Sequence, residues 1–219
     1  MKKNQKTLTL GLLCFLTVVI FSCKKEEVTE PSTFNYSTFT DARDGKIYKS
    51  IKIGTQVWMA ENLAFKTANG SWIYGDNEVD GNKYGRLYTW DAAKLAIPDG
   101  WHLPTDDEWK QLEKALGMSQ ADADGFEERG TNEGARLKSR SGWAENGNGT
   151  DEVGFLALPG GFFANSGSYL AVIWYGYWWT STESNSSSAF FRLLVSTDSK
   201  IHRKLSFKGD GFSVRCIKN

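Results

Sequence analysis

Apolar and polar residues alternate near both ends of the folded part of the chain, which predicts β-strands there. Within residues 44–63 the stretch IYKSIKI alternates, Gly54-Thr55 makes a turn, and VWM begins a return strand. Near the C-terminus, apolar residues recur at every second position: Phe212, Val214 and Cys216. We therefore expect a strand pair at the start of the domain and another strand at its end.

A helical pattern is clearest in GWHLPTDDEWKQLEKALG, residues 100–117. Thr105 and Glu108 have the spacing of a capping box, in which both side chains accept hydrogen bonds from free backbone N–H groups. Asp106 and Asp107 suit the positive end of the helix dipole. The apolar residues of one face follow at helical spacing: Trp109, Leu112 and Leu116. These acids are therefore interpreted as structural rather than catalytic.

Shorter patterns complete the fold prediction. Residues 86–96 and 131–143 suit short helical segments, and residues 67–85 resemble a loop. From residue 153 onward, short apolar runs separated by Gly, Asn, Ser and Asp predict strands. Together these patterns predict an α+β domain of short strands with two or three helices. In the run GYWWTSTE, adjacent residues point to opposite faces, so we expect Trp179 in the core and Trp178 under a loop.

The N-terminus has the pattern of an export signal. A basic start and an apolar stretch over residues 8–21 predict a signal peptide over residues 1–22. Ile20-Phe21-Ser22-Cys23 resembles the lipobox of bacterial lipoproteins, which implies lipid on Cys23. The acidic pair that follows resembles the surface-export tether of Bacteroidetes lipoproteins. We expect a lipidated flexible tether over residues 23–43, the folded domain over 44–219, and a location on the outer membrane facing the exterior.

Charge and cysteine content exclude two classes of function. Removal of residues 1–22 takes away three lysines and leaves 23 basic and 26 acidic residues. With no basic run interleaved with aromatics, nucleic-acid binding has no electrostatic footprint. Cys14 leaves with the signal and Cys23 carries lipid, so Cys216 has no cysteine partner within the domain and no cysteine zinc cluster is possible.

Six motifs occur in an order that resembles one protein family: VWMAENL, YTWDAA, IPDGWHLPTDDEW, GFLALPGGF, GYWWTSTE and GFSVRCIKN. They resemble the Fibrobacter succinogenes major paralogous domain over residues 44–219. That family is similar to the C-type-lectin-like fold and to formylglycine-generating enzymes, which implies paired N- and C-terminal strands. Its members are mostly secreted or lipid-anchored proteins of unknown biochemical role. Many have a cysteine where this chain has Ile97, so Cys216 is expected to be a buried thiol.

Enzymatic activity is not expected, because no nucleophile is marked, and an enzyme related to the sulfatase-modifying factors is the least favoured alternative. Cys216 lies in a predicted core strand, without a second cysteine to act with it. His102 precedes the helix cap, where a structural hydrogen bond is expected. His202 is expected on an exposed strand face. No catalytic residue, cofactor or metal site is therefore assigned.

One loop offers a weak calcium pattern. Asp76, Glu78 and Asp80 supply oxygens in DNEVDG and resemble the first half of an EF-hand loop. The twelfth position is Leu87, however, where a bidentate Glu is required. A polar turn is the favoured interpretation, and calcium binding stays a weak alternative.

Aromatic residues in predicted loops are the candidate ligand-binding residues: Trp72, Tyr74, Trp174 and Tyr175. Aromatic faces stack on the C–H faces of sugars, and exposed indoles in loops are costly unless they are used. The leading expectation is a non-enzymatic binding module for glycans. The alternative is a subunit of a surface assembly, in which the same rings contact another protein.

Overall fold

The computed structural model describes residues 34–219, which form an α+β domain with two β-sheets and five short α-helices. Sheet A contains five strands in the order β1-β2-β3-β14-β6. Their bounds are β1 Ser37–Thr40, β2 Ile47–Ile53, β3 Gln56–Met59, β6 Trp101–His102 and β14 Ile217–Lys218. The C-terminal β14 pairs with β3 through Ile217 and Trp58, so the first and last strands of the described residues share one sheet, as the family resemblance implies.

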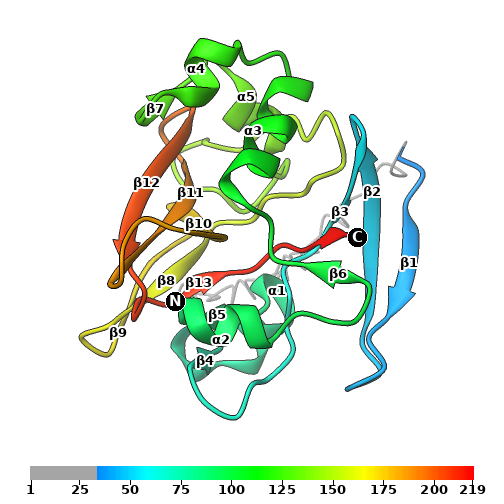
Figure 1. The fold of residues 1–219 in the computed structure, drawn as a ribbon, viewed down its shortest axis with the longest axis vertical. Coiled ribbons are helices and arrows are strands. Elements are labelled where there is room, and N and C mark those ends of the chain that lie inside the picture. Colours follow the sequence, from blue (N-terminus) through cyan, green and yellow to red (C-terminus); the bar gives the residue numbers. More distant parts are fainter. Residues whose placement is uncertain (1–33) are drawn as a thin grey trace, which may run out of the picture. The chain divides into compact units, whose positions relative to one another are not determined.

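Sheet B contains nine strands, of which seven follow the order β4-β5-β13-β10-β11-β12-β7, while β8 pairs with β10 and β9. Their bounds are β4 Ser71–Trp72, β5 Leu87–Tyr88, β7 Glu127–Arg129, β8 Gly160–Ala164, β9 Ser168–Val172, β10 Tyr175–Glu183, β11 Ser188–Val195, β12 Ile201–Phe207 and β13 Phe212–Ser213. Figure 1 shows the long strands of sheet B at the left and sheet A at the right.

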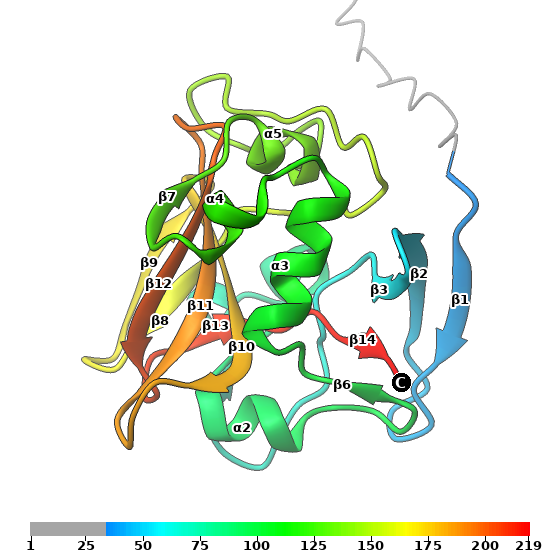
Figure 2. The same cartoon turned by 45° about the horizontal axis from the view of Figure 1, so that its top comes forward.

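The five helices are short and begin at polar caps. Their bounds are α1 Glu78–Tyr84, α2 Trp90–Leu95, α3 Asp106–Ala115, α4 Gln120–Asp124 and α5 Glu133–Leu137, with a 3₁₀ turn η1 at Tyr74–Asp76. The predicted capping box of α3 is confirmed: Thr105 and Glu108 each accept from the other's backbone N–H. Figure 2 shows α3 standing between the two sheets. No helix among the described residues is long and apolar enough to span a membrane.

The structure contains more helix than the sequence patterns predict. Residues 67–85, expected to be a loop, include α1, because the Asn77 side chain accepts a hydrogen bond from the Val79 N–H and caps this helix. The dipeptide Asp80-Gly81, which is typical of turns, lies within this seven-residue helix and obscured its periodicity. The expected count of two or three helices is therefore too low.

Residues assigned to the flexible tether include a paired strand. β1 lies within residues 23–43, yet Phe39 pairs with Tyr48 of β2 and its ring lies 4.3 Å from the ring of Trp101. The alternation in β2 also differs from expectation. Ile47 is exposed, while Tyr48 is buried against one core and Ile51 against the other.

Two apolar cores lie on opposite faces of sheet B. One contains Trp179 with Phe191 and Phe212, and the other contains Trp178 with Trp109 of α3. Trp179 is in the core as predicted. Trp178 is not simply covered by a loop, because its ring lies 6.4 Å from that of Trp109 and it is equally buried. Both tryptophans are therefore core residues, one for each face.

A buried ion network fixes α3 to the second face of sheet B. Arg192 Nη1 donates to Asp106 at 2.6 Å, and its Nε donates to Glu113 at 2.5 Å. Arg129 donates to both oxygens of Glu113 at 2.7 and 2.9 Å. Arg203 donates to Asp106 at 2.8 Å. Because each buried charge has a partner, this network orients the helix on the sheet.

Candidate functional site

Among the predicted ligand-binding residues, Trp174 is the exposed one. The residue is 39% accessible, and its neighbour Ile173 is 42% accessible. Both lie between β9 and β10, and we call residues Ala171–Trp174 the Trp174 turn. Tyr175 begins β10 and is half-buried, with its ring 6.1 Å from that of Tyr177. The structure therefore separates a surface indole from a tyrosine that packs against the core.

The backbone of the Trp174 turn is held in an unfavourable conformation. Ala171 and Ile173 both have φ of +64°, a region that β-branched residues rarely adopt. Ile173 N–H donates to Pro159 O at 2.9 Å, and Ile173 O accepts from Ala144 N–H at 2.8 Å. Such strain costs about 1 to 3 kcal/mol for each residue and persists only where the surroundings impose it. The exposure of Trp174 thus follows from a fixed turn.

Two polar segments flank this turn. The Ala144 contact brings in the loop that carries exposed Glu145 and Asn146. On the other side, Trp174 O accepts from Ser196 N–H at 2.8 Å, next to exposed Thr197. An indole with hydrogen-bonding side chains in the adjoining segments is a combination that suits a ligand with both apolar and polar faces.

The other predicted aromatics pack against the β8–β9 hairpin. Trp72 is half-buried, and its ring stacks on Phe163 at 4.2 Å. Tyr74 lies 5.4 Å from Tyr169, also half-buried. Burial, together with the hydrogen bond that Tyr169 donates to Asp76, raises the pKa of Tyr169 to about 12. These rings serve one another as packing partners, so the four candidates do not form one platform.

The three candidate calcium ligands have other partners or positions. Asp76 accepts the hydroxyl of Tyr169 at 2.6 Å, and Asp80 accepts from Asn77 at 3.4 Å. Glu78 and Asp80 lie in the first turn of α1, where acids complement the helix dipole. Among the described residues, these three carboxylates do not form a group with ligand atoms within 4.8 Å of one another.

A different set of possible metal ligands was missed by the sequence interpretation. Glu128, Asp198 and His202 bring ligand atoms within 4.8 Å of one another. His202 was expected to be exposed, and this is wrong: it is 7% accessible and its Nε2 lies 2.9 Å from Asp198. The register of β12 against β7 places Glu128 opposite His202. The EER stretch of β7 has no apolar alternation that would have predicted a strand.

His102 and Cys216 are among the residues that the sequence analysis weighed for catalysis. His102 Nδ1 contacts Asn219 at 2.6 Å and its Nε2 contacts Glu108 at 2.8 Å, so the hydrogen bond expected beside the helix cap is present. This histidine borders a shallow depression of about 380 Å³, which Lys94 and Trp101 also line. Cys216 is fully buried as expected, and burial raises the pKa of its thiol. Cys23 lies outside the described residues.

Residues from widely separated motifs meet at one side chain. Asn62 of VWMAENL accepts from Trp178 of GYWWTSTE at 2.9 Å and from Arg215 of GFSVRCIKN at 3.1 Å. A family model described as the Fibrobacter succinogenes major domain matches residues 51–218. The chain belongs to this family. The match begins within β2, so β1 lies outside the matched residues. Searches of curated proteins and of solved structures gave no match.

Proposed function

We propose that this protein is a lipid-anchored surface protein whose domain binds glycans through the Trp174 turn, without enzymatic activity. The observation that carries the proposal is the indole of Trp174, 39% exposed on a turn whose conformation is imposed by its neighbours. A rigid ring loses little conformational freedom when it stacks on the C–H face of a sugar.

The surroundings of Trp174 favour a glycan. Sugar hydroxyls require hydrogen-bonding partners beside the stacking ring, and exposed Glu145, Asn146 and Thr197 lie in the two flanking segments. A C-type-lectin-like fold is part of the proposal. Support comes from the sheet that joins the first and last described strands and from the ten-residue helix α3, which packs beside it.

A second candidate function is binding of a protein partner. Leu170 and Ile173, which are 45% and 42% accessible, extend the apolar surface beside Trp174. Tryptophan is enriched at the centres of protein interfaces, where the surrounding surface is more apolar than the rim. The glycan proposal is preferred because the flanking loops are polar, and a protein ligand is one outcome of the test below.

The proposed anchor at Cys23 rests on the lipobox-like sequence before it. Mass spectrometry of protein extracted from membranes should detect acyl groups on an N-terminal Cys23. An unmodified N-terminus at another position would contradict the anchor. The absence of enzymatic activity is proposed because the Cys216 thiol is buried and kept protonated, and both ring nitrogens of His102 have partners.

The binding proposal is tested by retention of the purified full chain on a panel of insoluble and immobilised polysaccharides. Trp174→Ala should abolish retention. Phe207→Ala is the matched control, because Phe207 is a 66% exposed aromatic at the far end of β12. The glycan proposal would be contradicted if the Trp174→Ala variant is still retained. It would also be contradicted if the wild-type chain is retained on no glycan and forms a stable complex with another protein instead.

A further inference from the structure

We propose that Glu128, Asp198 and His202 form a binding site for a divalent first-row transition-metal ion of the zinc class. The site lies at the outer edge of sheet B, where β7, β12 and the β11–β12 turn meet. It neither depends on the proposed glycan function nor includes any residue of the Trp174 turn.

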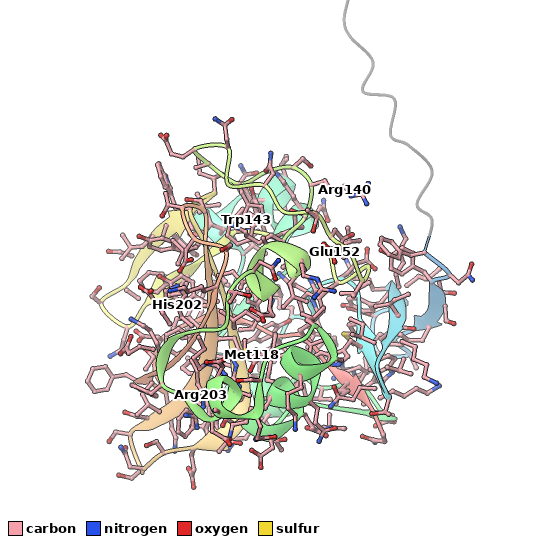
Figure 3. The ribbon with its side chains drawn as sticks, turned by 90° about the horizontal axis from the view of Figure 1, so that it is seen from above. Met118, Arg140, Trp143, Glu152, His202 and Arg203 are labelled. Carbon is pink, nitrogen blue, oxygen red and sulfur yellow. The ribbon has the colours of Figure 1, made fainter. Side chains whose placement is uncertain are left out.

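The fold brings the three side chains together from two strands and a turn. Glu128 and His202 are Cα partners in the antiparallel pair β7–β12, and side chains directly opposite each other share one face. Asp198 lies four residues before His202, in the turn that leads into β12. His202 of β12 is labelled in Figure 3.

The ligand types indicate which ion fits. Two carboxylate oxygens and one imidazole nitrogen suit zinc and its neighbours, whereas calcium and magnesium prefer oxygen alone. Ligands about 2.1 Å from a tetrahedral zinc ion lie about 3.4 Å apart. Asp198 and His202 are already 2.9 Å apart, and all three ligand atoms lie within 4.8 Å. Small side-chain rotations therefore complete a three-ligand site with positions open for water or a ligand oxygen.

A buried cation, Lys138, binds backbone carbonyls of the turn that carries Asp198. Lys138 Nζ donates to Asp198 O at 2.8 Å and to Val195 O at 3.0 Å. In the side chain of Asp198, Oδ1 accepts from Lys200 N–H at 3.0 Å, and Oδ2 is the oxygen that faces His202. Asp198 is thus oriented before any ion binds, which lowers the cost of ordering this ligand.

Two contacts compete with the metal: the hydrogen bond between His202 Nε2 and Asp198 Oδ2, which the ion must replace, and an ion pair at Glu128. Lys200 Nζ lies 3.4 Å from Glu128, and both side chains are more than one-third exposed. Exposed ion pairs of this kind contribute little to stability, because solvent screens them and two long side chains must be ordered. The Lys200 ammonium can therefore move into solvent when a doubly charged ion takes the carboxylate. Removal of this lysine should strengthen metal binding.

The test is isothermal titration of the chelator-treated full chain with ZnCl2, alongside MgCl2 and CaCl2. The expected result is one Zn²⁺ per chain, with clearly weaker binding of Mg²⁺ and Ca²⁺. His202→Gln should weaken Zn²⁺ binding at least about 100-fold, the upper end of what changes around metal ligands cost. His102→Gln is the matched control, because it removes an imidazole that also contacts a carboxylate but lies outside the group.

Because His202 is buried, its replacement could perturb folding, so Glu128→Gln provides a second variant at an exposed carboxylate. It should also weaken Zn²⁺ binding, while Lys200→Ala should tighten it. The proposal is overturned if Zn²⁺ does not bind at one per chain, or if Glu128→Gln and folded His202→Gln bind as wild type does. It is equally overturned if His102→Gln alone removes binding, or if Ca²⁺ binds as tightly as Zn²⁺.

Discussion

The indole N–H of Trp178 donates to the side-chain oxygen of Asn62 at 2.9 Å, inside the core between the two sheets. The same oxygen accepts from Arg215 Nε at 3.1 Å, and the Asn62 amide donates to Tyr84 O at 2.9 Å. Arg215 is fully buried, and among the described residues its hydrogen bonds go to neutral oxygens. Burial lowers the pKa of Arg215 to about 9. One amide therefore satisfies two donors that are expensive to leave unpaired.

Asn62→Ala should reduce the free energy of unfolding by about 2 to 4 kcal/mol, because it leaves the buried indole N–H of Trp178 and the Nε–H of Arg215 without their acceptor. Urea unfolding monitored by tryptophan fluorescence measures the effect. Asn69→Ala is the control, because Asn69 is exposed and its side chain makes no hydrogen bond within the described structure. Equal stability of the two variants would mean that Asn62 is not a structural centre.

The ion network should give the domain an acid-sensitive component. Burial alone would raise the pKa of Asp106, but hydrogen bonds and charges of Arg203 and Arg192 outweigh it and lower the pKa to about 2. A depressed folded-state pKa stabilises the domain above the unfolded value of about 4, and this contribution is lost as pH falls towards 2.

Asp106→Asn should therefore destabilise the domain near neutral pH. The difference in free energy of unfolding between this variant and wild type should shrink as the pH falls from about 5 to about 2.5. Chemical unfolding at several pH values measures that difference. Asp107→Asn, at the adjacent position where the side chain is 83% exposed, should give a small difference at every pH. If the difference in free energy of unfolding between wild type and Asp106→Asn stays constant with pH, the lowered pKa of Asp106 does not stabilise the domain.

Gly134 allows α5 to approach the β11–β12 turn. A Cβ at this position would overlap the carbonyl oxygen of Lys200 and lie 2.8 Å from that of Ser199. Gly134→Ala should lower the free energy of unfolding by about 1 to 3 kcal/mol, the range for overpacking. Gly160→Ala is the control, because its Cβ would meet Tyr84 at an ordinary 3.4 Å. Thermal unfolding of both variants compares the two positions directly.

Phe39→Ala tests whether β1 belongs to the folded domain. The Phe39 ring lies 5.4 Å from Tyr48 and 4.3 Å from Trp101, so its loss should cost about 1 to 2 kcal/mol, less than a fully buried phenylalanine would. Thr38→Ala, on the exposed side of the same strand, should have almost no effect. If both changes are neutral in urea unfolding, residues 37–40 behave as tether rather than as domain.

Features that depend on local sequence were predictable. The capping box of α3 requires two residues three positions apart, and the burial of Trp109 follows from helical spacing, so both are visible in a single stretch. The sequence placed Trp174 in a predicted loop but did not decide whether its side chain is exposed. The turn conformation at Ala171 and Ile173 decides this in the structure.

Features that depend on distant pairing were not predictable. Asp106 was interpreted as a dipole partner at a helix start, but it also binds Arg192, 86 positions away in sequence. His202 was expected to be exposed because its strand alternates with charged residues, yet the pairing of β7 covers it. In both cases a tertiary contact decides the environment of a residue whose local pattern allows several.

The most direct test of glycan binding through Trp174 is a glycan array probed with the purified full chain, the Trp174→Ala variant and the Phe207→Ala control. Wild type and Phe207→Ala should bind the same glycans, whereas Trp174→Ala should lose them while remaining folded by circular dichroism. Identical binding by Trp174→Ala and wild type, or no glycan bound by any of the three, would contradict glycan binding through Trp174.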